Sequence, residues 1–238
     1  MKALRVGFLF VVISIVCVSC FAQTVTNDKV FGVGMGVIGI VNADKIQFYQ
    51  QRSNSWITDP DDDFPLPKGY QSLFSPGLGV IGIVNADKIQ FYQQRSNSWI
   101  TDPDDDFKLP KGYESLFSPG LGVIGIVNAD KIQFYQQRSN SWITDPDDDF
   151  PLPEGYKSLF SPGLGVIGIA NADKIQFYQQ RSNSWITDPD DDFPLPKGYQ
   201  SLFSPGLGVI GIVSADKIQF YQQRNNSWIT DPDDDFIM

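Results

Sequence analysis

The stretch "GVIGIVNADKIQFYQQRSNSWITDPDDDF", from Gly36 to Phe64, decides the fold because it occurs five times with almost no change. The later copies begin at Gly79, Gly122, Gly165 and Gly208, which gives a repeat period of 43 residues. A fixed period of this length indicates a repeat architecture, in which each unit buries its apolar surface against its neighbours. The fold therefore depends on the structure that one unit adopts.

Each unit has the pattern of a small β-sheet. Residues 36–41 are rich in β-branched side chains, and residues 45–50 alternate between apolar and polar or amphipathic ones. These patterns predict two strands, and shorter strands are predicted at 55–58 and 69–75. Helical repeats are disfavoured because prolines and glycines interrupt the unit, with prolines at Pro60, Pro65, Pro67 and Pro76.

The segments between these strands predict an antiparallel sheet. Turns are predicted at 42–44, at 52–54 and at Ser75-Pro76-Gly77, while the longer segment 59–68 would lead to the next sheet. Units of about 40 to 50 residues with four strands are typical of β-propellers. The sequence therefore predicts an all-β fold, a five-bladed β-propeller with four antiparallel strands per blade.

The position of the strand at 69–75 within its blade stays open on pattern alone. If this strand is innermost, each blade is continuous in sequence. If it is outermost, the N-terminal segment instead closes the last blade. The first arrangement gives a single propeller domain over residues 23–238, with blades at about 28–66, 67–109, 110–152, 153–195 and 196–238.

The first 22 residues have the pattern of a signal peptide. Lys2 and Arg5 precede an apolar run, and Ala22 is a small residue suited to cleavage. The run is too short to span a bilayer, so we expect a secreted, extracellular product with no membrane insertion. Both cysteines, Cys17 and Cys20, lie in this leader, so the mature chain would have no thiol. The alternative is a bacterial lipoprotein signal at Cys20.

The charge of the mature chain excludes some partners. Without Lys2 and Arg5 it has 16 basic and 28 acidic side chains, a net charge of −12. Phosphate binding needs a basic surface, so nucleic acid is not an expected partner, and neither is an anionic membrane.

An enzyme is the least favoured class. The chain has no histidine, the mature part has no cysteine, and no Gly-x-Ser-x-Gly motif occurs. The common nucleophile and zinc sites therefore lack their residues. Paired carboxylates remain, but every blade offers the same set, and we expect neither catalysis nor a cofactor.

The repeat resembles the blade of the tachylectin family. The resemblance rests on Leu73-Phe74-Ser75-Pro76-Gly77, a following β-rich strand, Asp44-Lys45-Ile46 and Asn54-Ser55-Trp56, and it extends over all five units. It implies a five-bladed propeller lectin that binds N-acetylated amino sugars between neighbouring blades and serves in innate recognition of microbial surfaces. This unit is a few residues shorter, and it has an acidic and proline-rich connection where the family tends to carry Gly-Gly-Trp.

The candidate carbohydrate-binding residues follow from this resemblance together with side-chain chemistry. The resemblance implies Asp44, Asn54 and Trp56, and Tyr49 is added because a sugar needs a flat apolar surface beside directional polar groups. The alternative role of Trp56 is packing between blades. With their period mates, the candidates are Asp44, Tyr49, Asn54, Trp56, Asp87, Tyr92, Asn97, Trp99, Asp130, Tyr135, Asn140, Trp142, Asp173, Tyr178, Asn183, Trp185, Asp216, Tyr221, Asn226 and Trp228.

The acidic run at the end of each copy has two interpretations. Asp59, Asp61 and Asp63 are candidate calcium ligands, but the run lacks the glycine and the distal glutamate of a helix-loop-helix calcium site. We favour a solvated bridge between blades that keeps sheet edges from associating, and we expect no metal.

Near-identical copies suit a function that gains from number. The predicted function is a secreted multivalent lectin for terminal GlcNAc or GalNAc type glycans, since linked weak sites bind a repetitive surface with avidity. The alternative is a secreted structural or adhesion scaffold with no small-ligand pocket.

Overall fold

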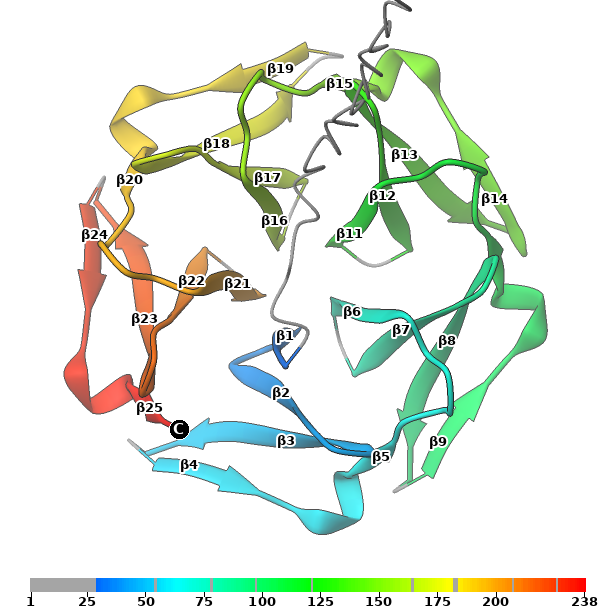
Figure 1. The fold of residues 1–238 in the computed structure, drawn as a ribbon, viewed down its shortest axis with the longest axis horizontal. Helices are drawn as coiled ribbons and strands as arrows, with labels where there is room; N and C mark the ends of the chain where they lie inside the picture. The colour runs from blue at the N-terminus through cyan, green and yellow to red at the C-terminus, as the bar shows by residue number, and fades with distance from the viewer. Residues whose placement is uncertain are drawn as a thin grey trace, which may run out of the picture.

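Each unit of the repeat folds into one antiparallel sheet in the computed structural model, which describes residues 29–53, 55–77, 79–96, 98–120, 122–163, 165–181, 184–206, 208–225 and 227–238. The five sheets stand around a central axis as the blades of a propeller (Figure 1). The predicted five-bladed fold is therefore confirmed. The signal peptide predicted at 1–22 lies outside the described residues.

The strands of a blade follow one another from the axis outward. The inner strands are β1 (Val30–Gly34), β6 (Ser72–Gly77), β11 (Ser115–Gly120), β16 (Ser158–Gly163) and β21 (Ser201–Gly206). The second strands are β2 (Val37–Asn42), β7 (Val80–Asn85), β12 (Val123–Asn128), β17 (Val166–Ala170) and β22 (Val209–Val213). Neighbouring inner strands contact one another around the axis, and β1 contacts β21 where the ring closes.

The outer half of each blade holds the longest strand and a short edge strand. The third strands are β3 (Lys45–Arg52), β8 (Lys88–Arg95), β13 (Lys131–Arg138), β18 (Lys174–Arg181) and β23 (Lys217–Arg224). The fourth strands are β4 (Ser55–Thr58), β9 (Ser98–Thr101), β14 (Ser141–Thr144), β19 (Ser184–Thr187) and β24 (Ser227–Thr230). We call the sheets β1–β5, β6–β10, β11–β15, β16–β20 and β21–β25 blades 1 to 5.

Two short elements lie in the segment that was predicted as a plain connection. One turn of 3-10 helix forms at η1 (Pro60–Asp62), η2 (Pro103–Asp105), η3 (Pro146–Asp148), η4 (Pro189–Asp191) and η5 (Pro232–Asp234). A two-residue strand follows at β5 (Phe64–Pro65), β10 (Phe107–Lys108), β15 (Phe150–Pro151), β20 (Phe193–Pro194) and β25 (Phe236–Ile237). β5 pairs with the start of β3 while β4 pairs with its end, so the two cover most of the outer edge of β3.

The turn predicted at Ser75-Pro76-Gly77 is wrong, because these residues end strand β6. The pairing of β6 with β7 shifts register between Phe74 and Gly77, which marks a β-bulge. A bulge accepts a proline because no ladder hydrogen bond needs its missing N–H. The Ser75 hydroxyl donates to the Val80 carbonyl at 2.7 Å and accepts from the Gly77 N–H at 3.0 Å. The chain therefore reverses direction after Gly77.

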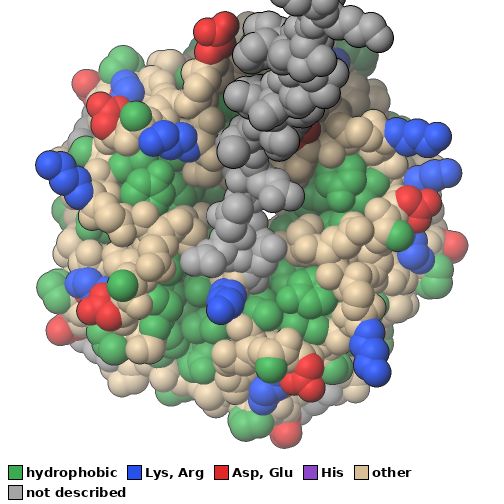
Figure 2. All heavy atoms as spheres, in the orientation of Figure 1, with side chains coloured by type: hydrophobic (Ala, Val, Ile, Leu, Met, Phe, Trp, Pro, Cys, Tyr) green, Lys and Arg blue, Asp and Glu red, His purple; other side chains and the backbone are tan. Residues whose placement is uncertain are grey.

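The core lies between blades. Ile46, Phe48 and Phe64 of blade 1 pack with Ile81 and Ile83 of blade 2, and equivalent clusters form at the other interfaces. On the face of the molecule in Figure 2, hydrophobic side chains gather in patches, and charged side chains lie mainly toward the rim.

A glycine in each second strand makes room for an aromatic ring. Gly82 stands opposite Phe74 in the register of β6 and β7. A Cβ at Gly82 would lie 2.5 Å from Cε1 of Phe74, so the ring covers the glycine where a larger residue would collide with it. This contact explains the second glycine of the Gly-Val-Ile-Gly motif.

Candidate functional site

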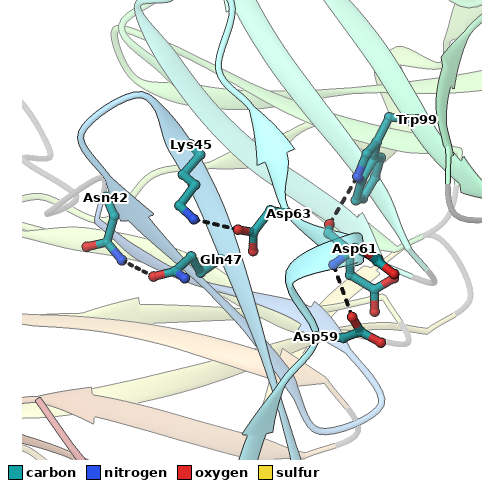
Figure 3. Close-up of polar contacts among 8 residues, drawn as sticks. Asn42, Lys45, Gln47, Asp59, Asp61, Asp63 and Trp99 are labelled. Atoms are coloured by element: carbon teal, nitrogen blue, oxygen red, sulfur yellow. Dashed lines mark hydrogen bonds and ion pairs between the residues drawn. The ribbon is translucent and has the colours of Figure 1, made fainter.

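The tryptophan of each outer strand holds two blades together. Trp99 belongs to blade 2, and its indole N–H donates to the backbone carbonyl of Asp62 in blade 1 at 3.1 Å (Figure 3). The same bond joins each other pair of neighbours: Trp56 to Asp234, Trp142 to Asp105, Trp185 to Asp148 and Trp228 to Asp191. The tryptophan therefore has the packing role that stood as the alternative to sugar contact.

Aromatic packing fixes the same indole from the side of the preceding blade. The ring of Trp99 stacks on Phe48 with centroids 5.4 Å apart, and it meets the edge of Phe64 at 5.2 Å. Tyr92 also contacts Phe64, with ring centroids 5.0 Å apart. Aromatic pairs at such distances contribute beyond the area they bury, so the interface holds both side chains in place.

The last part of the acidic run also joins neighbouring blades. The side-chain amide of Gln94 donates to Oδ1 of Asp62 at 2.5 Å, beside the bond from Trp99 to the Asp62 carbonyl. Gln94 stands opposite Trp99 in the pairing of β8 with β9, so both side chains face blade 1. Asp62 thus lies in the segment that leads from blade 1 to blade 2 and also holds the two blades together through hydrogen bonds to Gln94 and Trp99.

Two other carboxylates of the run, those of Asp59 and Asp63, have partners within their own blade. Oδ1 of Asp59 accepts from the Asp61 N–H at 3.0 Å and caps η1, while Oδ2 of Asp63 accepts from Nζ of Lys45 at 2.6 Å (Figure 3). Among the residues that the structure describes, no three histidine, cysteine, aspartate or glutamate side chains gather as a metal site. Oδ1 of Asp59 and Oδ2 of Asp63 are thus engaged by protein groups, whereas Oδ1 of Asp63 is buried without a hydrogen-bond partner.

A cavity opens between blades 1 and 2 beside Trp99. Its volume is about 500 Å³, and its walls combine Phe48, Trp99 and Ile57 with the polar side chains of Gln50, Arg52, Thr58, Asp59, Asp62 and Gln94. An equivalent cavity of about 350 Å³ between blades 2 and 3 is lined by Phe91, Trp142, Ile100, Gln93, Arg95, Thr101, Asp102, Asp105 and Gln137. The nine residues named for each cavity match by position in the repeat.

Arginine and glutamine form the polar wall of this cavity. Nε and Nη2 of Arg52 donate to Oε1 of Gln50 at 3.0 and 2.8 Å, and Nε of Arg95 donates to Oε1 of Gln93 at 2.9 Å. Ile57 is 44% exposed although it is a large apolar residue, and Ile100 has the same exposure. The wall therefore offers hydrogen-bond donors, acceptors and an accessible apolar surface in one place.

The structure separates the predicted site residues. Trp99 and Trp142 line the cavities, whereas neither tyrosine nor aspartate of the predicted set is among the residues lining them. Asp44 precedes the first residue of β3, and Arg52, which lines the cavity, is the last. The seven residue steps from Lys45 to Arg52 correspond to roughly 23 Å along the strand, so Asp44 and Arg52 lie at opposite ends of the blade.

The predicted tyrosines lie along the interface between these ends. Burial raises the pKa of Tyr135 and Tyr178, with a further contribution from the nearby carboxylates of Asp149 and Asp192. Their aromatic contacts to Phe107 and Phe150 place them against the preceding blade. These tyrosines therefore pack between neighbouring blades, as the tryptophans do.

Most of the predicted asparagines lie outside the described residues, namely Asn54, Asn97, Asn183 and Asn226. Asn140 is described, is exposed and has a positive φ of 60° in the turn between β13 and β14. This turn follows Arg138, so Asn140 lies at the end of its blade that corresponds to the cavity end of blades 1 and 2.

Sequence reasoning missed Gln50, Ile57, Thr58 and their period mates as cavity residues. A signal was present, because side chains alternate across a strand and Gln50 pairs with Ile57 on one face of the blade. The alternation alone does not predict which neighbouring blade packs against the face that carries Gln50 and Ile57.

A separate channel of about 450 Å³ follows the axis of the ring. It is lined by leucine, phenylalanine and serine side chains of the inner strands, including Leu73, Phe74 and Ser75.

Among the described residues, no helix is long and apolar enough to cross a membrane.

No protein-family model and no curated protein match the chain. Solved structures with a similar fold include Hsv2 of Kluyveromyces lactis, with 12% identity, a TM-score of 0.42, and coverage of 87% of this chain and 61% of that one. The WD40 domain of SCAP from fission yeast has 10% identity and a TM-score of 0.42, with coverage of 87% and 54%. A protein from Bacteroides uniformis described as a 6-phosphogluconolactonase candidate has 11% identity and a TM-score of 0.42, with coverage of 84% and 67%. These proteins differ in their described roles, so the comparisons assign no activity.

Proposed function

We propose that this protein is a secreted, multivalent carbohydrate-binding protein with one site at each interface between neighbouring blades. Its ligands are terminal N-acetylated amino sugars on cell-surface glycans. The observation that carries the proposal is the cavity beside Trp99, where an aromatic wall and an exposed isoleucine stand next to arginine, glutamine, threonine and aspartate.

The chemistry of the cavity suits a sugar ring. A pyranose has apolar C–H faces that favour a flat or branched apolar surface, and its hydroxyls need both donors and acceptors. Trp99, Phe48 and Ile57 supply apolar surface, while Arg52 and Asp59 supply a donor and an acceptor. Because Asp62 is bonded to Gln94 and to Trp99, the polar wall is held in place before a ligand arrives.

The repetition of the interface supports multivalent binding. All five tryptophans make the same bond to a neighbouring blade, so the five interfaces share one geometry in their outer part. Weak sites on one rigid ring gain about 10²- to 10⁴-fold in apparent affinity when they can bind a repetitive surface together. The resemblance of the repeat to tachylectin blades favours the same class of ligand.

The second candidate function is a secreted scaffold with no ligand. It is favoured by Trp99, whose N–H and one ring face are already used in packing between blades. In that case the five copies serve to close the ring, and the cavities contain water.

A glycan array with the purified protein distinguishes these functions. We expect selective binding to glycans that end in N-acetylated amino sugars, retained in EDTA because the carboxylates of Asp59 and Asp63 are each already held by a protein group. Binding lost in EDTA would assign the acidic run to the site. Absence of binding to every glycan would leave the scaffold.

Two sets of variants locate the site. The first replaces with alanine Arg52, Arg95, Arg138, Arg181 and Arg224. The control set replaces with asparagine Asp44, Asp87, Asp130, Asp173 and Asp216, at the other end of the blades. Loss of a charged hydrogen bond weakens binding by roughly tenfold or more, so the arginine set should lose affinity for a monovalent sugar while the control set keeps it. The reverse result would place the site at the aspartates.

Secretion has its own test. Expression of the whole chain in a secreting host should export a product whose first residue is Gln23, as determined by N-terminal sequencing. A product that keeps Met1 and stays in the cell would contradict this part of the proposal.

A further inference from the structure

The inner hairpin of blade 1 differs from its four counterparts. Its sequence is KVFGVGMG at residues 29–36, whereas blade 2 has SLFSPGLG at residues 72–79 and the remaining blades repeat the latter. Val33 therefore replaces the proline found at Pro76, and Met35 replaces the leucine found at Leu78. These substitutions make one of the five units distinct.

The changed residues lie at the candidate site. Val33 and Met35 line the cavity between blades 1 and 2, and Pro76 lines the cavity between blades 2 and 3 at the position that matches Val33. The first cavity has a volume of about 500 Å³ and the second about 350 Å³. Met35 is 70% exposed, whereas Val33 is 4% exposed and forms part of the core. The rim of the first cavity therefore carries an accessible methionine.

Methionine changes what the rim can bind. Its unbranched side chain has three rotatable bonds and a polarisable sulfur, so it adapts to apolar ligands and makes favourable contacts with aromatic rings. Valine in place of proline removes a rigid ring from the wall. The sugar-facing residues Phe48, Arg52 and Trp99 have counterparts in the second cavity, so the difference concerns what is attached to the sugar.

We propose that the site between blades 1 and 2 is specialised for an amino sugar that carries an aromatic or similarly bulky apolar substituent, whereas the other sites bind the sugar alone. Met35 is the residue that determines this specificity. This inference rests on the proposed function and adds a second class of site to it.

The chain provides a direct probe of this one site. Its three methionines are Met1, Met35 and Met238, and the N–H of Met238 bonds to the Asp216 carbonyl, at the end of blade 5 away from the cavities. With ¹³C-labelled methionine methyl groups, the Met35 resonance reports occupancy of the first site, and Met238 is the internal reference. The ligands are the methyl and p-nitrophenyl glycosides of N-acetyl-β-glucosamine.

We expect the p-nitrophenyl glycoside to shift the Met35 resonance with a dissociation constant about fivefold lower than that of the methyl glycoside. Calorimetry with the p-nitrophenyl glycoside should show one tight site among weaker ones.

The variant V33P/M35L should make all sites equally weak, and P76V/L78M in blade 2 should create a second tight site. The bulge of β1 between Gly32 and Gly34 gives the proline of V33P an irregular position, and M35L alone serves if V33P does not fold.

Five equal sites for the p-nitrophenyl glycoside, with an aryl preference unchanged in M35L, would overturn this inference and leave the proposed function intact. A Met35 resonance that stays fixed while calorimetry shows saturable binding would also overturn it. Absence of heat with both glycosides and of binding on the glycan array would overturn the proposed function as well.

Discussion

At the level of single residues, the indole N–H of each outer-strand tryptophan already donates to a carbonyl of a neighbouring blade, so it is not free to bind a ligand. Trp99 donates to the Asp62 carbonyl and stacks on Phe48, yet part of its surface still lines the cavity. One side chain therefore joins two blades and walls a candidate binding site. This double use explains why replacing the tryptophan is a poor test of sugar binding.

The variant Trp99→Phe separates the hydrogen bond from the ring. It keeps an aromatic side chain and removes the N–H that donates to Asp62, so the free energy of unfolding should fall by about 0.5–1.5 kcal/mol. Chemical denaturation measures the change. Trp99→Ala is the comparison, because losing a large packed ring costs about 3–5 kcal/mol. Equal stability of Trp99→Phe and the wild type would contradict a bonding role for the indole.

At the level of elements, the ion pair between β3 and the segment before β5 ties the outer blade together. The hydrogen bond from Lys45 to Asp63 raises the pKa of Lys45 above its ordinary value of 10.5, against a lowering by desolvation, and the same holds for Lys88, Lys131, Lys174 and Lys217. Burial raises the pKa of Tyr135 and Tyr178 above 10.0. All these groups bind their protons more tightly when the chain is folded.

This linkage predicts an alkaline loss of stability. A raised pKa in the folded state contributes stability that is fully present below the unfolded pKa and is lost as pH rises through the folded pKa. These groups should therefore leave the unfolding temperature unchanged between pH 7 and pH 9 and lower it above about pH 10. Replacing the five paired lysines with methionine should reduce this alkaline loss, whereas replacing exposed Lys68 should not. A rise in stability above pH 10 would contradict the assignment.

The sequence predicted the four main strands of a blade, including the short β4 at Ser55–Thr58, and missed the two-residue strand and the 3-10 turn. The alternation in Lys45–Arg52 and the β-branched run in Val37–Asn42 carry their own signal, and both strands formed close to the predicted bounds. β5 has two residues and carries no periodicity, and it forms because its pairing with Lys45 and Ile46 covers the outer edge of β3 beyond β4. The bulge at Ser75 and Pro76 likewise depends on pairing with β7.

At the level of the whole molecule, closure of the ring depends on a glycine. A Cβ at Gly32 would lie 1.8 Å from the carbonyl oxygen of Ser204 in blade 5, which is a backbone atom. The other four blades have serine at this position. β1 therefore approaches β21 more closely than a side chain allows, and the first blade differs where it meets blade 5.

The variant Gly32→Ser tests this closure, because it makes blade 1 match its neighbours and should nonetheless destabilise the ring. Overpacking against a backbone atom costs at least about 1–3 kcal/mol of unfolding free energy. The reverse change, Ser75→Gly, removes hydrogen bonds of one hydroxyl and should cost only about 1 kcal/mol. Denaturant unfolding of both variants measures the difference. A Gly32→Ser protein as stable as the wild type would show that the close approach is not required.

The candidate site shows the limit of what the repeat could predict. The period established which residues are equivalent, and the tryptophans were correctly placed at interfaces between blades. It did not establish which end of a strand shares a cavity with them. Asp44 and Arg52 stand at opposite ends of β3, and only the three-dimensional pairing of blades shows that Arg52 lines the same cavity as Trp99.

If each interface between blades binds one N-acetylated amino sugar, the number of sugars bound per chain equals the number of interfaces. Titration calorimetry of the purified protein with methyl N-acetyl-β-glucosaminide and methyl N-acetyl-galactosaminide measures that count. We expect saturation at one sugar per interface, five per chain, unchanged in EDTA and weakened in the variant that lacks the five cavity arginines. Absence of saturable heat with either sugar would contradict it.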